Sequence, residues 1–326
     1  MKAVQVTRSG GPDVLKFLDV PEPTAGDGQV LVKVEVAGVN YADILARRGV
    51  YPLAPPPPFV LGFEVAGTVT ALGPSVSGLQ VGDRVVGFTA GGAGGYAERA
   101  LSPAPLLFRL PAGVSLQDAA AHFITFNTAY HCLKTRGRVQ PGETVLIQAA
   151  AGAVGTAAIQ LAKLLGARVL ACASSDDKLA RVKALGADAT INYATTDFVE
   201  AARRETGGRG VNVVLESVGG EVFEKSLQAL APAGRLVVFG AASGVPGAVQ
   251  VPALQKNNLT LATFSIKGTA AQDPAGLRAG ALELLGLLEQ GKVRPVIGRR
   301  FSLAEAAQAQ QYIESRASFG KVLLIP

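Results

Sequence analysis

The segment with the clearest chemical potential is residues 149–155, with the sequence AAAGAVG. It follows a continuous apolar stretch, 144–148, that predicts a buried strand, and it leads into an apolar-periodic stretch, 154–165, that predicts a helix. In such a strand–turn–helix, glycine lets the backbone approach a pyrophosphate, and free N–H groups of the first helical turn bind the phosphates. Ala150 stands where the first glycine of the usual dinucleotide fingerprint would be. The predicted phosphate-binding residues are Gly152, Ala153, Val154 and Gly155.

The tip of the next predicted strand indicates which dinucleotide binds. NAD-binding proteins carry an acid there, about 20 residues after the turn, for the ribose 2′-hydroxyl. In this chain Ser174 occupies the tip, and Lys178 follows one helical turn later. A hydroxyl and an ammonium accommodate a phosphate that a carboxylate would repel, so we expect NADPH rather than NADH. Asp176 and Asp177 are interpreted as N-terminal capping residues of the helix that follows.

Side chains that could act as nucleophiles or metal ligands are sparse. The two histidines, His122 and His131, have no partner at metal-ligand spacing and are interpreted as core or surface residues. The two cysteines, Cys132 and Cys172, lie in apolar segments and predict buried free thiols. There is no Gly-x-Ser-x-Gly elbow and no evident Cys/His nucleophile pair. Because hydride transfer is the chemistry of the cofactor, this scarcity favours a nicotinamide-dependent reductase.

The phosphate turn belongs to a β-α alternation that runs from about residue 122 to 265. Near-continuous apolar strands separated by helices predict a parallel sheet covered on both faces. The expected strands are 144–148, 168–172, 189–191, 211–215 and 235–239, and the expected helices are 154–165, 177–185, 198–205 and 223–230.

The rest of the chain lacks this rhythm. Residues 1 to about 120 contain short β-branched runs separated by Gly and Pro, which predict a β-rich barrel or sandwich. Two helices, 276–289 and 303–314, and a last strand, 321–325, are expected near the C-terminus and are assigned to the same lobe. The first lobe is therefore predicted to be interrupted by the second.

Composition narrows the function classes. With 326 residues the chain is about twice the length of a typical domain of ~150 residues. Hydrophobic residues make up 48% and charged residues 17%, which excludes a disordered chain. The net charge of +6 is not gathered among aromatic residues, so we expect no nucleic-acid partner. No stretch reaches the ~18 apolar residues of a membrane span, and no signal peptide is visible, so a cytoplasmic protein without a membrane partner is expected.

Short motifs in one order along the whole length resemble a known family. They are 37–43 (AGVNYAD), 48–52, 62–67 (GFEVAG), 82–85, 94–98, 126–130, 149–155, 191–193, 216–220 (ESVGG), 239–240 and 319–322. The chain resembles the zinc-independent quinone oxidoreductases, the zeta-crystallin-like group of the medium-chain dehydrogenase/reductase superfamily. The resemblance implies an α/β protein: a GroES-like catalytic domain, 1–122 and 266–326, and a doubly wound Rossmann NADPH-binding domain, 123–265.

The resemblance also implies that no metal takes part. Zinc-dependent relatives place a cysteine at the position of Asn40 and a histidine at the position of Phe63, and a phenyl ring cannot bind zinc. Leu45 departs from the pattern, because some relatives carry an aromatic residue there, and this affects the expected shape of the quinone pocket.

The resemblance to the family also implies roles for individual residues of this sequence. Asn40 is expected to hydrogen-bond the nicotinamide side of the cofactor, and Asn40 and Tyr51 are the catalytic candidates. Tyr51 either orients a carbonyl or is a turn aromatic beside Pro52, and the proton donor is left open between Tyr51 and solvent. The other implied cofactor contacts are Asp43 (loop support), Thr128 (nicotinamide or ribose), the 152–155 turn, Ser174, Lys178 and Tyr193 (2′-phosphate), Ser217 and Val218 (adenosine), Phe239, Gly240, Phe264 and Ser265 (nicotinamide), and Lys321 (substrate end).

The expected function is reduction of a quinone by NADPH bound in a crevice between the two lobes. One alternative is reduction of the C=C bond of an enone or enoyl thioester by a related enzyme. Another is a low-turnover NADPH-binding protein, crystallin-like, that touches RNA through its basic surface. A homodimer paired through Rossmann-lobe edge strands is implied by the resemblance alone.

Overall fold

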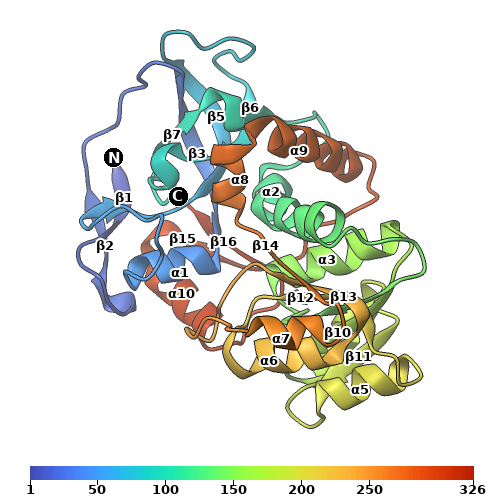
Figure 1. Ribbon diagram of the computed structural model, residues 1–326. Coiled ribbons are helices and arrows are strands. Elements are labelled where there is room, and N and C mark those ends of the chain that lie inside the picture. Colours follow the sequence, from blue (N-terminus) through green and yellow to red (C-terminus); the bar gives the residue numbers. More distant parts are fainter. The chain divides into compact units, whose positions relative to one another are not determined.

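The computed structural model describes residues 1–326, which form two compact units (Figure 1). Unit 1 comprises Met1–Ile124 and Thr269–Pro326, and unit 2 comprises Thr125–Gly268. The chain passes from one unit to the other within helices α2 (Leu116–Tyr130) and α8 (Ile266–Gln272). No helix is both long enough and apolar enough to span a membrane.

Unit 2 is built on a six-stranded sheet in the order β11-β10-β9-β12-β13-β14. Every neighbouring pair in it is parallel. This is the doubly wound dinucleotide-binding order, in which the chain turns back between the first and fourth strands, here β9 and β12. The strands are Thr144–Ile147 (β9), Arg168–Ala173 (β10), Ala189–Asn192 (β11), Val211–Glu216 (β12), Leu230–Val238 (β13) and Thr260–Thr263 (β14).

The helices of unit 2 pack apolar faces on this sheet. In α3, Ala158, Ile159 and Leu161 are buried, as the helical spacing of apolar residues predicts. Gly166, with φ 75°, follows the C-terminal end of α3, in the conformation that glycine adopts most easily after a helix. The helices are Ala153–Leu164 (α3), Asp176–Ala184 (α4), Phe198–Glu205 (α5), Gly220–Ala229 (α6) and Val251–Gln255 (α7).

The predicted strands and helices of the β-α region are all present, and a few features were not foreseen. β13 begins at Leu230, where the sequence predicted the end of a helix, because Leu230 already pairs with Val211. Residues His131–Arg136 form a π-helical turn after α2. Strand β14 and the short helix α7 were also not predicted, since they lie in a segment without clear periodicity.

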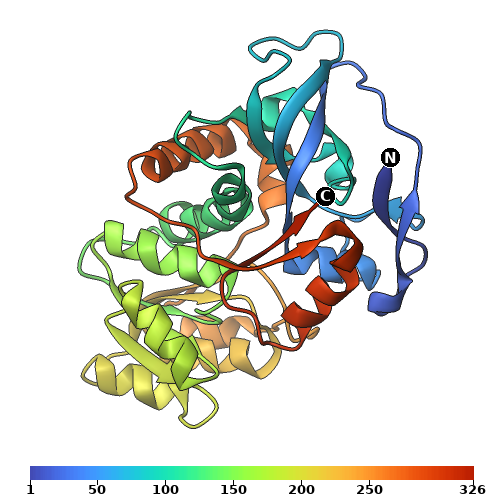
Figure 2. The ribbon, with the colours of Figure 1, turned by 180° about the vertical axis from the view of Figure 1, so that it is seen from behind.

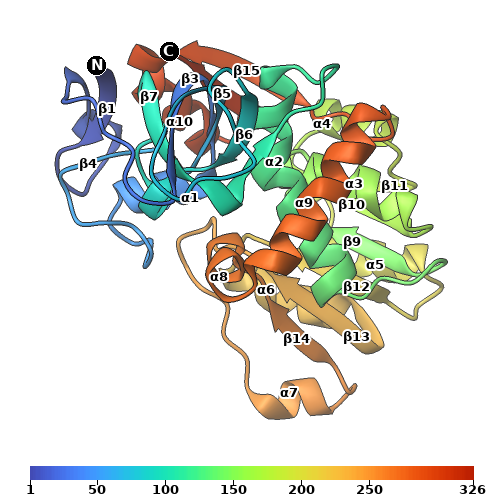
Figure 3. The same ribbon diagram turned by 90° about the horizontal axis from the view of Figure 1, so that it is seen from above.

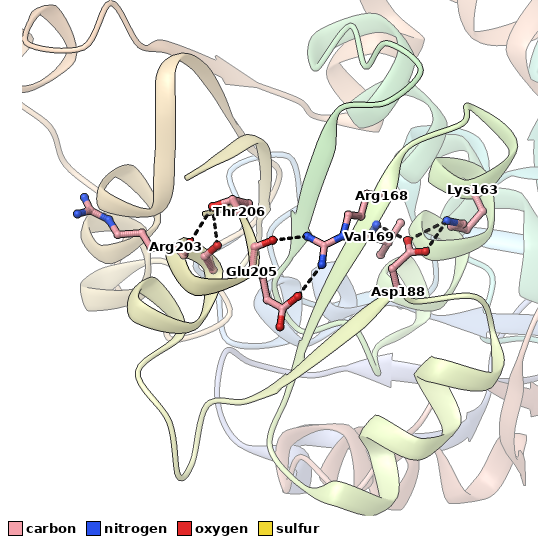
Figure 4. Close-up of polar contacts among 8 residues, drawn as sticks. Lys163, Arg168, Val169, Asp188, Arg203, Glu205 and Thr206 are labelled. Atoms are coloured by element: carbon pink, nitrogen blue, oxygen red, sulfur yellow. Dashed lines mark hydrogen bonds and ion pairs between the residues drawn. The ribbon is translucent and has the colours of Figure 1, made fainter. Parts of the chain in front are cut away.

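Ion pairs tie the outer strands and helices of unit 2 together (Figure 4). Arg168 of β10 bonds the Glu205 carboxylate of α5 at 2.5 Å. Lys163 of α3 bonds Asp188 at 2.8 Å, and the same carboxylate accepts the Val169 N–H at 2.7 Å. All four charged side chains are more than a third exposed, so the pairs orient the elements more than they stabilise them.

Unit 1 contains a seven-stranded sheet and a three-stranded sheet. The larger sheet joins both ends of the unit, because β16 pairs antiparallel with β3 (Figure 2). Its strands are Gln29–Val39 (β3), Glu64–Leu72 (β5), Arg84–Phe88 (β6), Arg99–Pro103 (β7), Leu107–Arg109 (β8), Ile297–Ser302 (β15) and Lys321–Ile325 (β16). The smaller sheet contains Lys2–Val6 (β1), Leu15–Asp19 (β2) and Phe59–Val60 (β4).

Helices and short 3₁₀ turns complete unit 1. The helices are Tyr41–Arg47 (α1), Pro274–Glu289 (α9) and Ala306–Glu314 (α10), and the turns are Pro12–Val14, Ala90–Gly92, Ala104–Leu106 and Leu303–Glu305. Arg47 of α1 is buried and bonds the Glu314 carboxylate of α10 with both terminal nitrogens, at 2.7 and 3.2 Å. This bidentate pair fixes the C-terminal helix to the segment that follows β3.

Candidate functional site

The phosphate turn of unit 2 has an open helix end. Gly152 is the N-cap of α3 and supplies no capping side chain, so the N–H groups of the first turn have no intrahelical partner. A Cβ atom at Gly155 would lie 2.6 Å from the carbonyl oxygen of Ala149, so only glycine fits there. Ala149 itself adopts φ +48°, a left-handed conformation that glycine would adopt without strain. The geometry suits close approach of an anion such as a pyrophosphate.

The strand tip after β10 differs from the prediction in one respect. Ser175, and not Asp176 or Asp177, is the N-cap of α4, and its side chain accepts the backbone N–H of Lys178 at 3.5 Å. The aspartates lie in the first helical turn, where carboxylates favour the positive helix end. Asp176 also accepts a hydrogen bond from Asn192 at 2.8 Å.

A second cation stands beside Lys178. Burial, together with the nearby positive charge of Arg181, lowers the pKa of Lys178. Residues three apart on a helix share a face, so Arg181 could have been recognised from its spacing, but it was missed. Ser174 is partly buried at the tip of the strand, and Tyr193 after β11 is 41% exposed. An anion bound here would offset the repulsion between the two cations.

Buried polar atoms lie at the point where the strand order reverses. Gln148 follows β9 and Glu216 ends β12, and ligands of such sheets bind at this switch point. The Gln148 Nε2 and Glu216 Oε2 atoms are buried without a hydrogen-bond partner. Glu216 Oε1 accepts the N–H groups of Val218 and Gly219 at 2.5 and 2.9 Å, which fixes the loop that carries Ser217 and Val218. Together with the open helix end, these groups fit a dinucleotide.

Other predicted cofactor contacts of unit 2 lie on the loops after its strands. The Ala242 N–H donates to the Ser217 carbonyl at 2.9 Å and the Ser243 N–H to the Val218 carbonyl at 2.8 Å, so the loops after β12 and β13 are joined. Phe239 and Gly240 begin the second of these loops.

The segment around the π-helical turn carries an aromatic pair. The Phe264 ring stacks on the His131 ring, with centroids 5.4 Å apart and planes at 13°. Thr128 is buried in α2, one turn before His131, and Ser265 is exposed after β14. The structure therefore places His131, which the sequence analysis set aside, beside a predicted nicotinamide contact. Both cysteines are buried free thiols, as predicted.

In unit 1 a buried ion pair surrounds the Asn40 amide. Lys321 Nζ and Glu64 Oε1 form a short ion pair, and both side chains are almost completely buried. Asn40 Nδ2 donates to Glu64 Oε1 at 2.9 Å, and Lys321 Nζ donates to Asn40 Oδ1 at 2.7 Å. Glu64 Oε2 accepts the N–H of Ile124 at 3.0 Å. Glu64 was missed as a site residue, although it lies in the 62–67 motif next to Phe63.

Asp43 fixes the backbone on the other side of Asn40. Its Oδ2 atom accepts the Asn40 N–H at 2.7 Å and the Tyr96 hydroxyl at 3.0 Å. Asp43 is fully buried, and this burial raises its pKa to about 7. Burial, reinforced by the negative charge of Asp43, also raises the pKa of Tyr51. Tyr51 packs on Phe63, with ring centroids 5.5 Å apart.

Comparisons with known proteins agree with both units. Residues 26–112 match the family described as the alcohol dehydrogenase GroES-like domain, and residues 153–286 match the zinc-binding dehydrogenase family. Over 325 residues the chain is 37% identical to the quinone oxidoreductase of Pseudomonas aeruginosa, covering 100% of this chain and 99% of the relative. The solved structure of Escherichia coli quinone oxidoreductase complexed with NADPH matches with a TM-score of 0.95 at 34% identity, covering 100% of both chains.

The chain belongs to the quinone oxidoreductase family. This confirms the predicted membership of the medium-chain dehydrogenase/reductase superfamily and the predicted α/β fold, a GroES-like domain with a Rossmann parallel sheet. Members of this family are oxidoreductases, and this chain is one of them. A further relative, the 2-haloacrylate reductase of a Burkholderia species, is 34% identical over 329 residues, covering 99% of this chain and 98% of the relative.

The residues of this quinone oxidoreductase family member do not fit a catalytic zinc ion, although one of the matching family descriptions names zinc. Phe63 offers no donor atom, and the Asn40 amide oxygen is bonded to an ammonium group, which would repel a divalent cation. The structure contains no group of three or more His, Cys, Asp or Glu side chains that could hold a metal ion.

Proposed function

We propose that this protein is a zinc-independent NADPH:quinone oxidoreductase. The observation that carries the cofactor choice is the strand tip after β10, where Ser174, Lys178 and Arg181 stand without an acid at the ribose position. The quinone acceptor is supported by the names of the relatives from Pseudomonas aeruginosa and Escherichia coli. The choice of NADPH is also supported by the NADPH in the Escherichia coli structure.

NADPH, when bound, would supply a hydride to the acceptor. The residues of this chain would bind and orient the cofactor and the acceptor. We propose that the open end of α3 holds the pyrophosphate and that the strand tip after β10 holds the 2′-phosphate, with Tyr193. The loops after β12 and β13 would line the adenosine and nicotinamide parts through Ser217, Val218, Phe239 and Gly240. In unit 2, Thr128, Phe264 and Ser265 would contact the nicotinamide. In unit 1, Asn40, Asp43, Tyr51 and Lys321 are the candidates for binding or orienting a ligand.

The test of the proposal is NADPH oxidation against a panel of quinones, with NADH as the control cofactor. The variant Ser174→Ala/Lys178→Ala should raise the KM for NADPH at least about tenfold, since charge-assisted bonds to one phosphate are lost, and leave the KM for NADH unchanged. An unchanged KM for NADPH would show that the 2′-phosphate binds elsewhere.

A second candidate function is reduction of a conjugated C=C bond. The similarity to the 2-haloacrylate reductase of Burkholderia favours it. Enones and a halogenated acrylate should be assayed beside the quinones. The class of acceptor with the larger kcat/KM decides between C=C reduction and quinone reduction. If NADPH binds but no acceptor oxidises it, the low-turnover NADPH-binding protein is the better description.

We also propose a homodimer that forms through the edge of the unit 2 sheet. Strand β14 pairs only with β13 and is the outermost strand in Figure 3. Its Thr260 and Thr263 side chains are exposed, and no charged residue interrupts the strand. An unpaired edge of this kind can add a strand from a second copy. Sedimentation of the wild type and of Leu261→Pro tests this, because proline removes a backbone donor from the edge strand.

A further inference from the structure

The Asn40 side chain has almost all of its hydrogen-bonding capacity occupied inside unit 1. A primary amide has two N–H donors and one oxygen that accepts two hydrogen bonds. Nδ2 donates to Glu64 Oε1 at 2.9 Å and, less directly, to the Gly38 carbonyl at 3.4 Å. Oδ1 accepts from Lys321 Nζ at 2.7 Å. What remains is one acceptor position on Oδ1.

The orientation of the amide follows from the chemistry of its neighbours. An ammonium group can only donate, and a carboxylate can only accept. The atom next to Lys321 is therefore the amide oxygen, and the atom next to Glu64 is the amide nitrogen. Rotating the amide by 180° would place two donors together at Lys321 and two acceptors together at Glu64.

The surrounding backbone is shaped to admit this ion pair. A Cβ atom at Gly38 would lie 2.2 Å from Glu64 Oε1 and 2.8 Å from Lys321 Cε. Glu64 and Lys321 are almost completely buried. Asn40 occupies the N-cap position of α1 and faces Asp43 in a capping box, but its side chain accepts no cap hydrogen bond of normal geometry. The hydrogen bonds that hold the amide are therefore those to the ion pair.

We propose that Glu64 and Lys321 are positioning residues that fix the Asn40 amide so that it offers a bound ligand one hydrogen-bond acceptor and no donor. This inference rests on the proposed function. Asn40 would accept from an N–H or O–H group, of the kind that a carboxamide or a ribose hydroxyl carries. It would not donate to the carbonyl oxygen of the electron acceptor, so polarisation of that carbonyl falls to another group.

The decisive variant exchanges the two polar groups. In Asn40→Asp/Glu64→Gln, one carboxylate still faces Lys321, and the new glutamine can donate to the new carboxylate while accepting from Ile124 N–H. The net charge is kept and position 40 can only accept, although the amide nitrogen of the new glutamine cannot accept the Lys321 bond that Glu64 Oε1 accepts. The control is Glu64→Gln, which loses the same bond and gains no carboxylate at position 40 for Lys321. We expect the exchange variant to have at least about threefold tighter NADPH binding or higher kcat with a quinone than Glu64→Gln. An exchange variant that folds and performs no better than Glu64→Gln would overturn the proposal.

Single variants test whether the ion pair positions anything. Asn40→Asp sets two carboxylates against one ammonium, and Glu64→Gln leaves Lys321 without its counter-ion. Each should weaken NADPH binding, measured by fluorescence titration without acceptor, or lower kcat by at least about tenfold. Wild-type values in both would contradict the proposal. The control Asp19→Asn breaks an exposed ion pair of the same unit, Lys2–Asp19, and should change neither value.

Asn40→Ala covers the case in which the single variants do not fold. It keeps the Glu64–Lys321 pair, so the protein should fold, and it should lose NADPH affinity or kcat. Full affinity and full kcat would overturn the proposal. Failure of the proposed function is a different result, because it appears in the wild type, which then neither binds NADPH nor reduces an acceptor.

Discussion

The two candidate binding regions use opposite means to present polar groups. In unit 2 the groups are backbone N–H donors of the open helix end at Gly152, supplied by residues that are neighbours in sequence. In unit 1 the group is a single side chain, Asn40, held by Glu64 and Lys321 from distant parts of the chain. The first region depends on the space that a glycine leaves, and the second depends on balanced buried charge.

This difference predicts how substitutions in each region affect stability and ligand binding. A buried charge that loses its partner destabilises the folded state strongly, because it cannot return to water. A backbone turn that gains a methyl group suffers a steric clash whose cost is limited by small shifts of its neighbours. Substitutions in unit 1 should therefore affect folding first, and substitutions in the unit 2 turn should affect ligand binding at least as much as stability.

The largest effect is expected from Lys321→Met, which leaves Glu64 buried without its counter-ion. The free energy of unfolding should fall by about 3–5 kcal/mol. Denaturant unfolding measures the change. Glu64→Leu/Lys321→Met should be more stable than Lys321→Met alone, since no uncompensated charge remains. Wild-type stability of the single variant would show that the pair does not compensate buried charge.

A pH dependence follows from Asp43, because burial raises its pKa from the ordinary aspartate value of 3.8 to about 7 in the folded protein. The folded state holds this proton more tightly than the unfolded state, so the contribution of Asp43 to stability is greatest below about pH 4 and falls as the pH rises through 7. A difference of about three pKa units corresponds to up to ~4 kcal/mol. Asp43→Asn should flatten this part of the stability profile, measured by unfolding between pH 4 and 8. A profile as steep as that of the wild type would assign the dependence to another group.

A smaller effect is expected in the phosphate turn. Gly155→Ala should destabilise unit 2 by about 1–3 kcal/mol, because its methyl group meets the backbone of Ala149 and Ala150. Gly152→Ala is the matched control, since its Cβ would make one tight contact, with the Ala149 carbonyl oxygen at 3.2 Å, that a small shift relieves, and its φ of −74° suits any residue. The control should lose clearly less stability than Gly155→Ala. Equal loss in both variants would contradict the steric explanation.

The smallest effect is expected at the ion pairs drawn in Figure 4. Lys163→Gln breaks an exposed pair with Asp188, and the expected loss of stability is about 0.2–1 kcal/mol, reduced further by added salt. A loss of stability as large as that of Lys321→Met would show that the exposed Lys163–Asp188 pair and the buried Lys321–Glu64 pair contribute equally, whatever their exposure.

The sequence predicted the sheet of unit 2 well because its signals are local. Apolar strands, periodic helices and the 149–155 turn can each be recognised within a short window. Helix α1 was missed because its residues were seen only as a family motif, and β14 was missed because it is a short edge strand with exposed ends. The π-helical turn after α2 leaves no periodic signal of its own.

The candidate site, like the fold, was predictable from the sequence only in part. Gly152, Ser174 and Lys178 were found because they lie at fixed distances from a strand end. Glu64 was missed, and Lys321 was expected to approach the substrate, because their pairing joins residues 257 positions apart. Sequence spacing contains no information about such a contact.

The position of Lys321 also has a consequence for biosynthesis. The residues of unit 2 leave the ribosome before Lys321 does, so unit 2 can form its sheet while unit 1 still lacks β15 and β16. Until then, Glu64 has no counter-ion, and residues 37–39 of β3 lack β16 as a partner strand. The first 124 residues of the nascent chain are therefore the part that a chaperone would need to protect longest.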